Sequence, residues 1–139
     1  MAKVSLSSHY PVSPEAIWQM IGSFNSLPEW HPAVAKCEIE TEGDTTLRRL
    51  HLVGGGTILE KLEKSDKDGQ SYTYSILESP LPVANYTSTI RVSEGEGGGC
   101  TIEWSSEFEA EGAPENDATK VIEGIYQTGF DNLRKMFGG

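Results

Sequence analysis

Apolar residues recur at spacings of three and four from Pro114 to Phe137, a pattern typical of one face of an α-helix. Pro114 suits the first helical position, because an N–H group there has no partner within the helix. Acidic residues begin the segment, while Arg134 and Lys135 end it, which is the order that the helix dipole favours. The pattern predicts one long C-terminal helix whose wide apolar face packs against another layer.

Alternating apolar and polar residues fill most of the preceding chain and predict strands. We expect seven, at residues 3–10, 33–41, 45–53, 57–64, 70–77, 84–93 and 99–110. Their short connections favour antiparallel pairing. After the first strand, Ser13 and Pro14 predict the start of a short helix that ends near Gly22, and residues 24–30 add another helical turn or two.

The predicted fold class is therefore α+β. A seven-stranded, curved antiparallel sheet wraps around the long C-terminal helix, and two short helices follow the first strand. Such an arrangement leaves space between the sheet and the helix, where small ligands bind.

Two opposite charges fall on the apolar face of the third and fourth predicted strands. Arg48 alternates in phase with Leu50, and Glu60 alternates in phase with Ile58. We expect Leu50 to pair with Glu60, which places Arg48 diagonally across from Glu60 and within reach of it. Buried charges are costly unless paired, and pairs of this kind often mark functional sites. Arg48 and Glu60 are therefore the candidate catalytic residues, although a purely structural ion pair fits the same pattern.

The predicted inner face is also rich in aromatic residues, which offer apolar area together with hydroxyl or indole donors. Plain core packing is the alternative for each residue taken alone. Two glycines interrupt the long helix, and we expect Gly129 mainly to let the helix approach the sheet. The candidate ligand-binding residues are Trp30, Leu50, Tyr72, Tyr74, Tyr86, Ser88, Trp104, Phe108, Ile125 and Gly129.

Composition narrows the possible partners. The 139 residues fit one domain, spanning 1–139, and carry a net charge of −10, which argues against nucleic acids and anionic membranes. No apolar run has the length of a membrane span, and Cys37 and Cys100 form no disulfide framework, so we expect a cytoplasmic protein. The three histidines lack metal-ligand spacing, so we expect no metal, and we expect His31 to be a solvated residue.

A resemblance to a known family is carried by the predicted order of elements and by the segments Val12–Trp18, Leu27–Pro32, Leu47–Arg48, Glu60–Leu62, Tyr72–Ile76 and Ile102–Trp104. With these features the chain resembles the START-like, or SRPBCC, superfamily, and within it the polyketide cyclase/dehydrase-like group. That resemblance implies the helix-grip fold over most of the chain. The chain is also similar to plant lachrymatory factor synthase, which implies an inward arginine and glutamate at the positions of Arg48 and Glu60.

Three functions stay open at this point. The first is binding of a small apolar or amphipathic molecule whose weakly acidic group pairs with Arg48. The second is a cofactor-independent cyclase, dehydrase or isomerase, in which Glu60 moves a proton and Arg48 stabilises an oxyanion. The third is a ligand-gated interaction module that uses the Leu81–Tyr86 loop and the corner at Trp30. We rank binding first and catalysis second.

Overall fold

The computed structural model describes residues 1–138, so residue 139, the last of the predicted domain, lies outside the described residues. Seven strands and three α-helices form in the predicted order. The elements are β1 (Ala2–Tyr10), α1 (Pro14–Ile21), α2 (Leu27–Trp30), β2 (Val34–Glu42), β3 (Thr45–Leu52), β4 (Thr57–Asp66), β5 (Ser71–Glu78), β6 (Val83–Glu94), the 3₁₀ turn η1 (Glu96–Gly98), β7 (Cys100–Ala110) and α3 (Glu115–Phe137).

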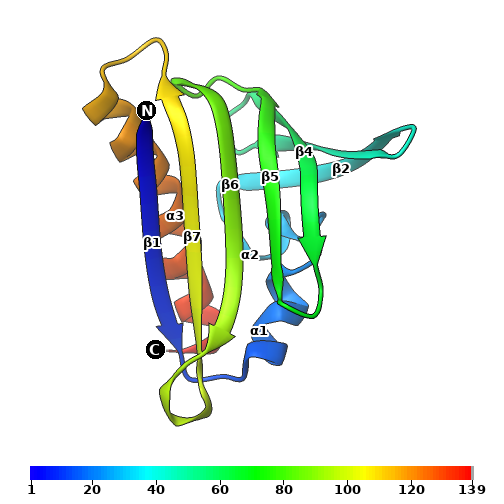
Figure 1. The fold of residues 1–139 in the computed structure, drawn as a ribbon, viewed down its shortest axis with the longest axis vertical. Helices are drawn as coiled ribbons and strands as arrows, with labels where there is room; N and C mark the ends of the chain where they lie inside the picture. Colours follow the sequence, from blue (N-terminus) through cyan, green and yellow to red (C-terminus); the bar gives the residue numbers. More distant parts are fainter. Residues whose placement is uncertain (139) are drawn as a thin grey trace.

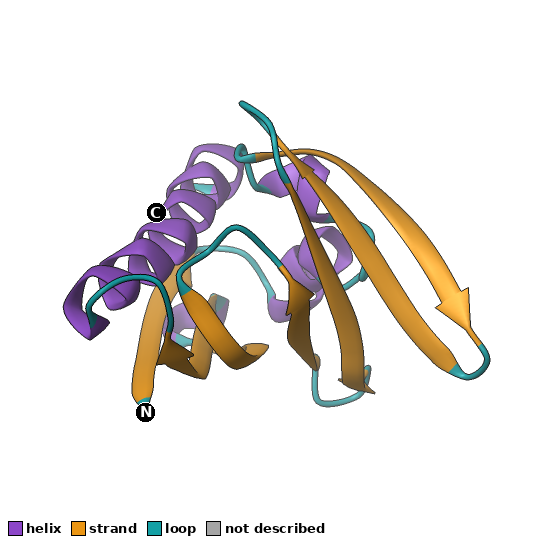
Figure 2. Cartoon of the chain, turned by 90° about the horizontal axis from the view of Figure 1, so that it is seen from above, coloured by secondary structure: helices purple, strands orange, loops and turns teal. Residues whose placement is uncertain are grey.

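All strands belong to one antiparallel sheet with the order β1-β7-β6-β5-β4-β3-β2. Figure 1 shows β1, β7, β6 and β5 side by side, with α3 passing behind β1 and β7. The chain crosses from β1 at one edge to β2 at the other through α1 and α2. The sheet curves, and the helices lie on its inner side (Figure 2). This is the predicted helix-grip α+β fold, and the prediction is confirmed.

The helix ends follow the local sequence closely. The Ser13 hydroxyl accepts a hydrogen bond from the Ala16 N–H at 3.2 Å and caps α1, while Gly22 ends it. Helix α3 begins at Glu115, one residue later than predicted, because Pro114 keeps an extended conformation and acts as the N-cap. None of the helices within residues 1–138 combines the length and apolar character that crossing a membrane requires.

Two contacts between α3 and β1 fix one side of the molecule. The Tyr10 hydroxyl donates to the Phe130 carbonyl at 3.0 Å, and Arg134 donates to the Ser8 hydroxyl at 2.5 Å. Ala118, Phe130 and Leu133 are fully buried on the same face of α3. The helix is therefore held against one end of the sheet, and its other flank faces β3–β5 across the interior.

The register between β3 and β4 differs from the predicted one by two residues. Leu50 pairs with Ile58, and Arg48 lies directly opposite Glu60 rather than diagonally across from it. The loop is displaced by one residue, because the Leu52 N–H donates to the Gly56 carbonyl and centres the loop on Gly54 instead of Gly55. Gly54, Gly55 and Gly56 all adopt positive φ angles in this loop, a conformation that glycine reaches without strain.

Candidate functional site

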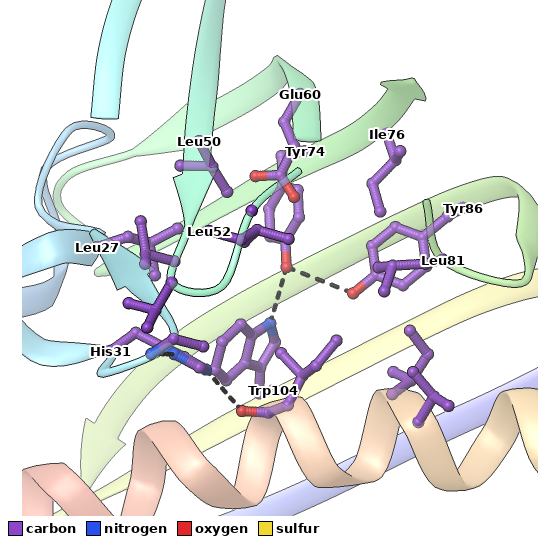
Figure 3. A pocket seen from close by; sticks show the side chains of 17 residues that line it. Leu27, His31, Leu50, Leu52, Glu60, Tyr74, Ile76, Leu81, Tyr86 and Trp104 are labelled. Atoms are coloured by element: carbon purple, nitrogen blue, oxygen red, sulfur yellow. Dashed lines mark hydrogen bonds between the residues drawn. The ribbon is translucent and has the colours of Figure 1, made fainter. Parts of the chain in front are cut away.

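A cavity of about 260 Å³ lies between the sheet and the helices (Figure 3). Its floor comes from β3, β4 and β5, and its opposite wall comes from α3, with α2, the following loop and β7 closing the sides. The lining residues are Leu27, His31, Ala33, Val34, Leu50, Leu52, Val53, Gly55, Glu60, Tyr74, Ile76, Leu81, Tyr86, Trp104, Val121, Ile122 and Ile125. Most of this wall is apolar, as expected for a pocket that takes a hydrophobic ligand.

Glu60 is the one charged side chain among these lining residues, all of which lie within residues 1–138. It belongs to β4, between Arg48 on β3 and Ile76 on β5. Figure 3 shows its carboxyl group pointing toward the space above Tyr74. The side chain is only 6% exposed, so its charge stays far from bulk water.

Arg48 lies behind Glu60 and does not line the cavity, which corrects the expectation that both side chains point into the hollow. Its Nε donates to Glu60 Oε1 at 2.6 Å, and its Nη1 donates to the Phe24 carbonyl at 3.0 Å. The guanidinium carbon also lies 4.1 Å from the centre of the Phe24 ring and 4.8 Å from that of Tyr74. These rings fill the space around the guanidinium group, so Arg48 fixes Glu60 instead of contacting a ligand.

The ion pair determines the charge of both groups. Burial, the largest single effect, lowers the pKa of Arg48, but Glu60 together with Tyr72 and Tyr74 outweighs it and raises the pKa, so the guanidinium stays charged. Burial raises the pKa of Glu60, and the nearby Arg48 charge opposes that rise without cancelling it. The site thus places a buried acidic group at an apolar cavity, with a permanent cation 2.6 Å behind it.

A cluster of hydroxyl groups forms a second polar feature beside Glu60. The Trp104 Nε1–H donates to the Tyr74 hydroxyl and to the Ser88 hydroxyl, both at 3.1 Å. The Tyr74 and Tyr86 hydroxyls lie 3.4 Å apart, and Tyr86 is hydrogen-bonded to Tyr126. Burial raises the pKa of Tyr74 and Tyr86 well above the ordinary value, so both remain neutral phenols.

His31 is buried and lines the cavity, so the prediction of a solvated histidine is wrong. Its Nδ1 accepts a hydrogen bond from the Ala33 N–H at 3.2 Å. Because Nδ1 is an acceptor, Nε2 carries the proton and donates to the Ile125 carbonyl at 2.8 Å. Burial lowers the pKa of His31, with the Ile125 carbonyl opposing the shift. Both ring nitrogens are engaged, which leaves neither free to act as a base.

The candidate residues divide into two groups in space. Leu50, Glu60, Tyr74, Tyr86, Trp104 and Ile125 line the cavity. The others are buried behind its wall: Arg48, Trp30, Tyr72, Ser88, Phe108 and Gly129. A Cβ atom at Gly129 would lie 2.9 Å from both Trp30 and His31 and 3.3 Å from Trp104. This glycine therefore lets α3 pack closely against the end of α2 first and against the sheet second, whereas we expected mainly an approach to the sheet.

Several residues that line the cavity were not among the candidates chosen from the sequence. Leu52 and Ile76 share the faces of Leu50 and Tyr74, so their alternation could have added them to the set. Val121 and Ile122 precede Ile125 by four and three residues on α3, so helical spacing could have found them as well. Val53, Gly55 and Leu81 come from two loops, where no periodic signal exists. Within residues 1–138, no three His, Cys, Asp or Glu side chains gather as metal ligands would.

The whole described chain matches one protein family. Residues 1–138 match the model of the family described as polyketide cyclase/dehydrase and lipid transport. Protein XoxI from Bacillus cereus is similar in structure, with a TM-score of 0.94 at 38% identity, covering 99% of this chain and 96% of that one. No curated protein matches the chain.

More distant structures share the fold alone. A START superfamily protein from Mycobacterium smegmatis has a TM-score of 0.81 at 12% identity, with 97% of this chain and 96% of the other covered. The ZhuI aromatase/cyclase from Streptomyces sp. R1128 has a TM-score of 0.73 at 14% identity, with 97% and 95% covered. The distant structures agree with the observed fold, and the match over residues 1–138 leads to one conclusion: the chain belongs to the polyketide cyclase/dehydrase and lipid transport family.

Proposed function

We propose that this protein binds a small, largely apolar molecule in the cavity between β3–β5 and α3, with the polar group of the ligand next to Glu60. The observation that carries this proposal is an apolar hollow of about 260 Å³ with a buried carboxylate at its edge. Ligand pockets commonly start at about 300 Å³, so the ligand is small, of the size of one or two rings. The description of the family, which includes lipid transport, is consistent with hydrophobic ligand binding.

The contacts of the Arg48–Glu60 pair beside the cavity support ligand binding over a purely structural ion pair. An ion pair in a solid core commonly adds no stability over apolar residues of the same volume. Here Arg48 makes three hydrogen bonds and lies over the faces of three rings, while Glu60 lines the cavity on its other side. Because Arg48 already holds the Glu60 carboxyl group in position, a ligand can bind beside it without any rearrangement of the cavity wall.

Two neighbouring residues of β5 provide a matched test. Ile76 lines the cavity, whereas Leu77 is 50% exposed on the other side of the strand. We expect Ile76→Trp to fill the cavity and abolish saturable binding of the neutral fluorescent probe N-phenylnaphthylamine. Leu77→Trp should bind the probe as the wild type does. Equal binding by both variants would place the probe outside this cavity and refute the proposal.

Catalysis is the second candidate, and the enclosed Glu60 carboxyl favours it. Burial raises the pKa of Glu60, which suits a group that both takes up and releases a proton. The name of the ZhuI aromatase/cyclase points to chemistry of the same general type, although only the fold is shared. Arg48 does not reach the cavity, so it would not stabilise an oxyanion in this catalytic mechanism. Its role would be to position Glu60.

Proton transfer by Glu60 is measurable without knowing the natural substrate. If Glu60 acts as a base, the wild-type protein should speed exchange of the α-hydrogens of 4-hydroxycyclohexanone in deuterated water, followed by NMR. Glu60→Gln should abolish the acceleration, because an amide does not take up the proton. Exchange at the uncatalysed rate with the wild-type protein would leave binding as the only supported function.

A further inference from the structure

The Ser88 hydroxyl determines which groups donate and which accept in the hydrogen bonds beside the cavity. The Ser88 hydroxyl lies 2.9 Å from the carbonyl of Ser105, and a carbonyl only accepts, so Ser88 donates there. The Ser88 and Tyr126 hydroxyls are 3.0 Å apart. Since Ser88 has already used its one proton, Tyr126 must donate to Ser88.

Because each hydroxyl has one proton, the donor and the acceptor of each remaining hydrogen bond in this cluster are also determined. Tyr126 has used its proton on Ser88, so it accepts from Tyr86. Tyr86 in turn accepts from Tyr74, and Tyr74 accepts from the Trp104 indole N–H. All O–H and N–H groups of this cluster are therefore used within the cluster or on the Ser105 carbonyl, and hydrogen bonds linked in this way strengthen one another.

The other donors on the wall are engaged as well. His31 Nε2–H is used on the Ile125 carbonyl. At the mouth, the Gly55 N–H donates to the Leu52 carbonyl, and the Val53 N–H donates to the Ala33 carbonyl. The Leu81 N–H donates to the Ser79 hydroxyl. Among the lining side chains, which all lie within residues 1–138, we find no N–H or O–H left for a ligand.

What remains open to a ligand is acceptor capacity. Glu60 uses Oε1 for Arg48, and its other oxygen can only accept while the group is ionised opposite a guanidinium 2.6 Å away. The Tyr74 and Tyr86 oxygens also keep lone pairs beside the cavity, because each accepts one hydrogen bond from within the cluster.

We infer that the cavity selects ligands by a hydrogen-bond donor: an apolar alcohol, phenol or amine binds, and a ketone, ether or carboxylate of the same shape is rejected. This inference rests on the proposed function and specifies the ligand class for it. It replaces the expected pairing of an acidic ligand with Arg48, because Arg48 lies behind the wall. An acceptor group placed against Glu60 would leave both polar partners without a proton between them, which is costly in a dry site.

Menthol and menthone test the inference, because they share one carbon skeleton and differ in having a hydroxyl or a carbonyl group. We expect calorimetric titration of the wild-type protein to show menthol binding about tenfold more tightly than menthone, the usual effect of a lost hydrogen bond to a charged group. Cyclohexanecarboxylate should bind more weakly than cyclohexanol for the same reason.

Two variants should reduce the difference in affinity between menthol and menthone. Tyr86→Phe removes the acceptor of the Tyr74 proton, so that the Tyr74 hydroxyl turns toward the cavity and donates to menthone. Glu60→Gln presents an amide N–H while its carbonyl still accepts from Arg48. Tyr10→Phe is the control, because it removes a buried hydroxyl bonded to Phe130, away from the cavity, and should keep the preference. Thermal melting establishes that each variant is folded.

The outcomes separate the two proposals. Equal affinity for menthol and menthone, or tighter binding of menthone, overturns the inference and leaves the proposed binding function intact. A preference for menthol that survives both Tyr86→Phe and Glu60→Gln also overturns it. If the wild-type protein binds none of these compounds, the proposed function fails, and the inference fails with it.

Discussion

At the scale of single residues, Arg48 has the largest predicted effect on stability. It is fully buried, and its charge is balanced by Glu60 at 2.6 Å. Removing one partner of a buried pair leaves the other charge without compensation, which is far more costly than losing a surface ion pair. The adjacent Arg49 offers the comparison, since it pairs with Glu40 at 2.8 Å while remaining one-third exposed.

We predict that Arg48→Met lowers the free energy of unfolding by about 3–5 kcal/mol. Arg49→Met should change it by no more than about 1 kcal/mol, as expected for an exposed pair. Urea denaturation measures both values. The double variant Arg48→Met/Glu60→Leu should recover much of the loss, because no unpaired charge remains. Equal effects of the two single variants would contradict this account of the pair.

Titration of the buried His31 should make the stability of the protein depend on pH. Its ordinary pKa of 6.5 applies to the unfolded chain, and burial lowers the pKa in the folded protein. The unfolded state therefore binds a proton first as the pH falls, so the His31 contribution is present above pH 6.5 and is lost below it. We expect the free energy of unfolding to fall by at most about 1.4 kcal/mol per pH unit from this group.

The comparison with a second histidine isolates this effect. His31→Gln should remove the corresponding part of the slope between neutral and mildly acidic pH, measured by urea denaturation at several pH values. His51→Gln is the control, because His51 is partly exposed and bonded to Glu38. A slope that is unchanged in His31→Gln would show that His31 does not titrate as described.

At the scale of elements, the two glycines of α3 have opposite roles. A Cβ at Gly124 would meet nothing within 4 Å, whereas one at Gly129 would meet Trp30 and His31 at 2.9 Å. Alanine favours a helix interior over glycine by about 1 kcal/mol. We predict that Gly124→Ala raises the melting temperature and Gly129→Ala lowers it, as thermal denaturation would show. An increase in both variants would mean that α3 has room to move away from α2.

The elements themselves could be predicted from the sequence because their signals are local. Helix α3 shows its apolar period, and α1 shows its Ser13 cap. The register of β3 and β4 could not be predicted, because the sequence does not reveal on which of the three consecutive glycines, Gly54–Gly56, the loop is centred. The resulting shift by two residues preserves the faces, so Arg48 and Glu60 were still placed together.

At the scale of the whole molecule, the cavity arises from how the layers meet. Helix α3 packs against β1 and β7, and the sheet curves beyond them toward β3 and β2 (Figure 2). Period-two alternation identified which side chains face inward, but it does not tell which of them meet open space. Trp30 and Phe108 are buried as solid core, whereas Leu81 and Val53 line the cavity from loops. That difference depends on the full packing of the chain.

The most direct test of the central claim is an NMR titration of methyl-labelled protein with menthol. If the ligand enters the cavity, the methyl signals of Leu50, Ile76 and Ile122 should shift and saturate together, since all three line it. The signals of Ile39 and Leu77, which are exposed, should not move with them. Shifts confined to exposed methyl groups, or the absence of any saturable shift at the cavity, would contradict the account.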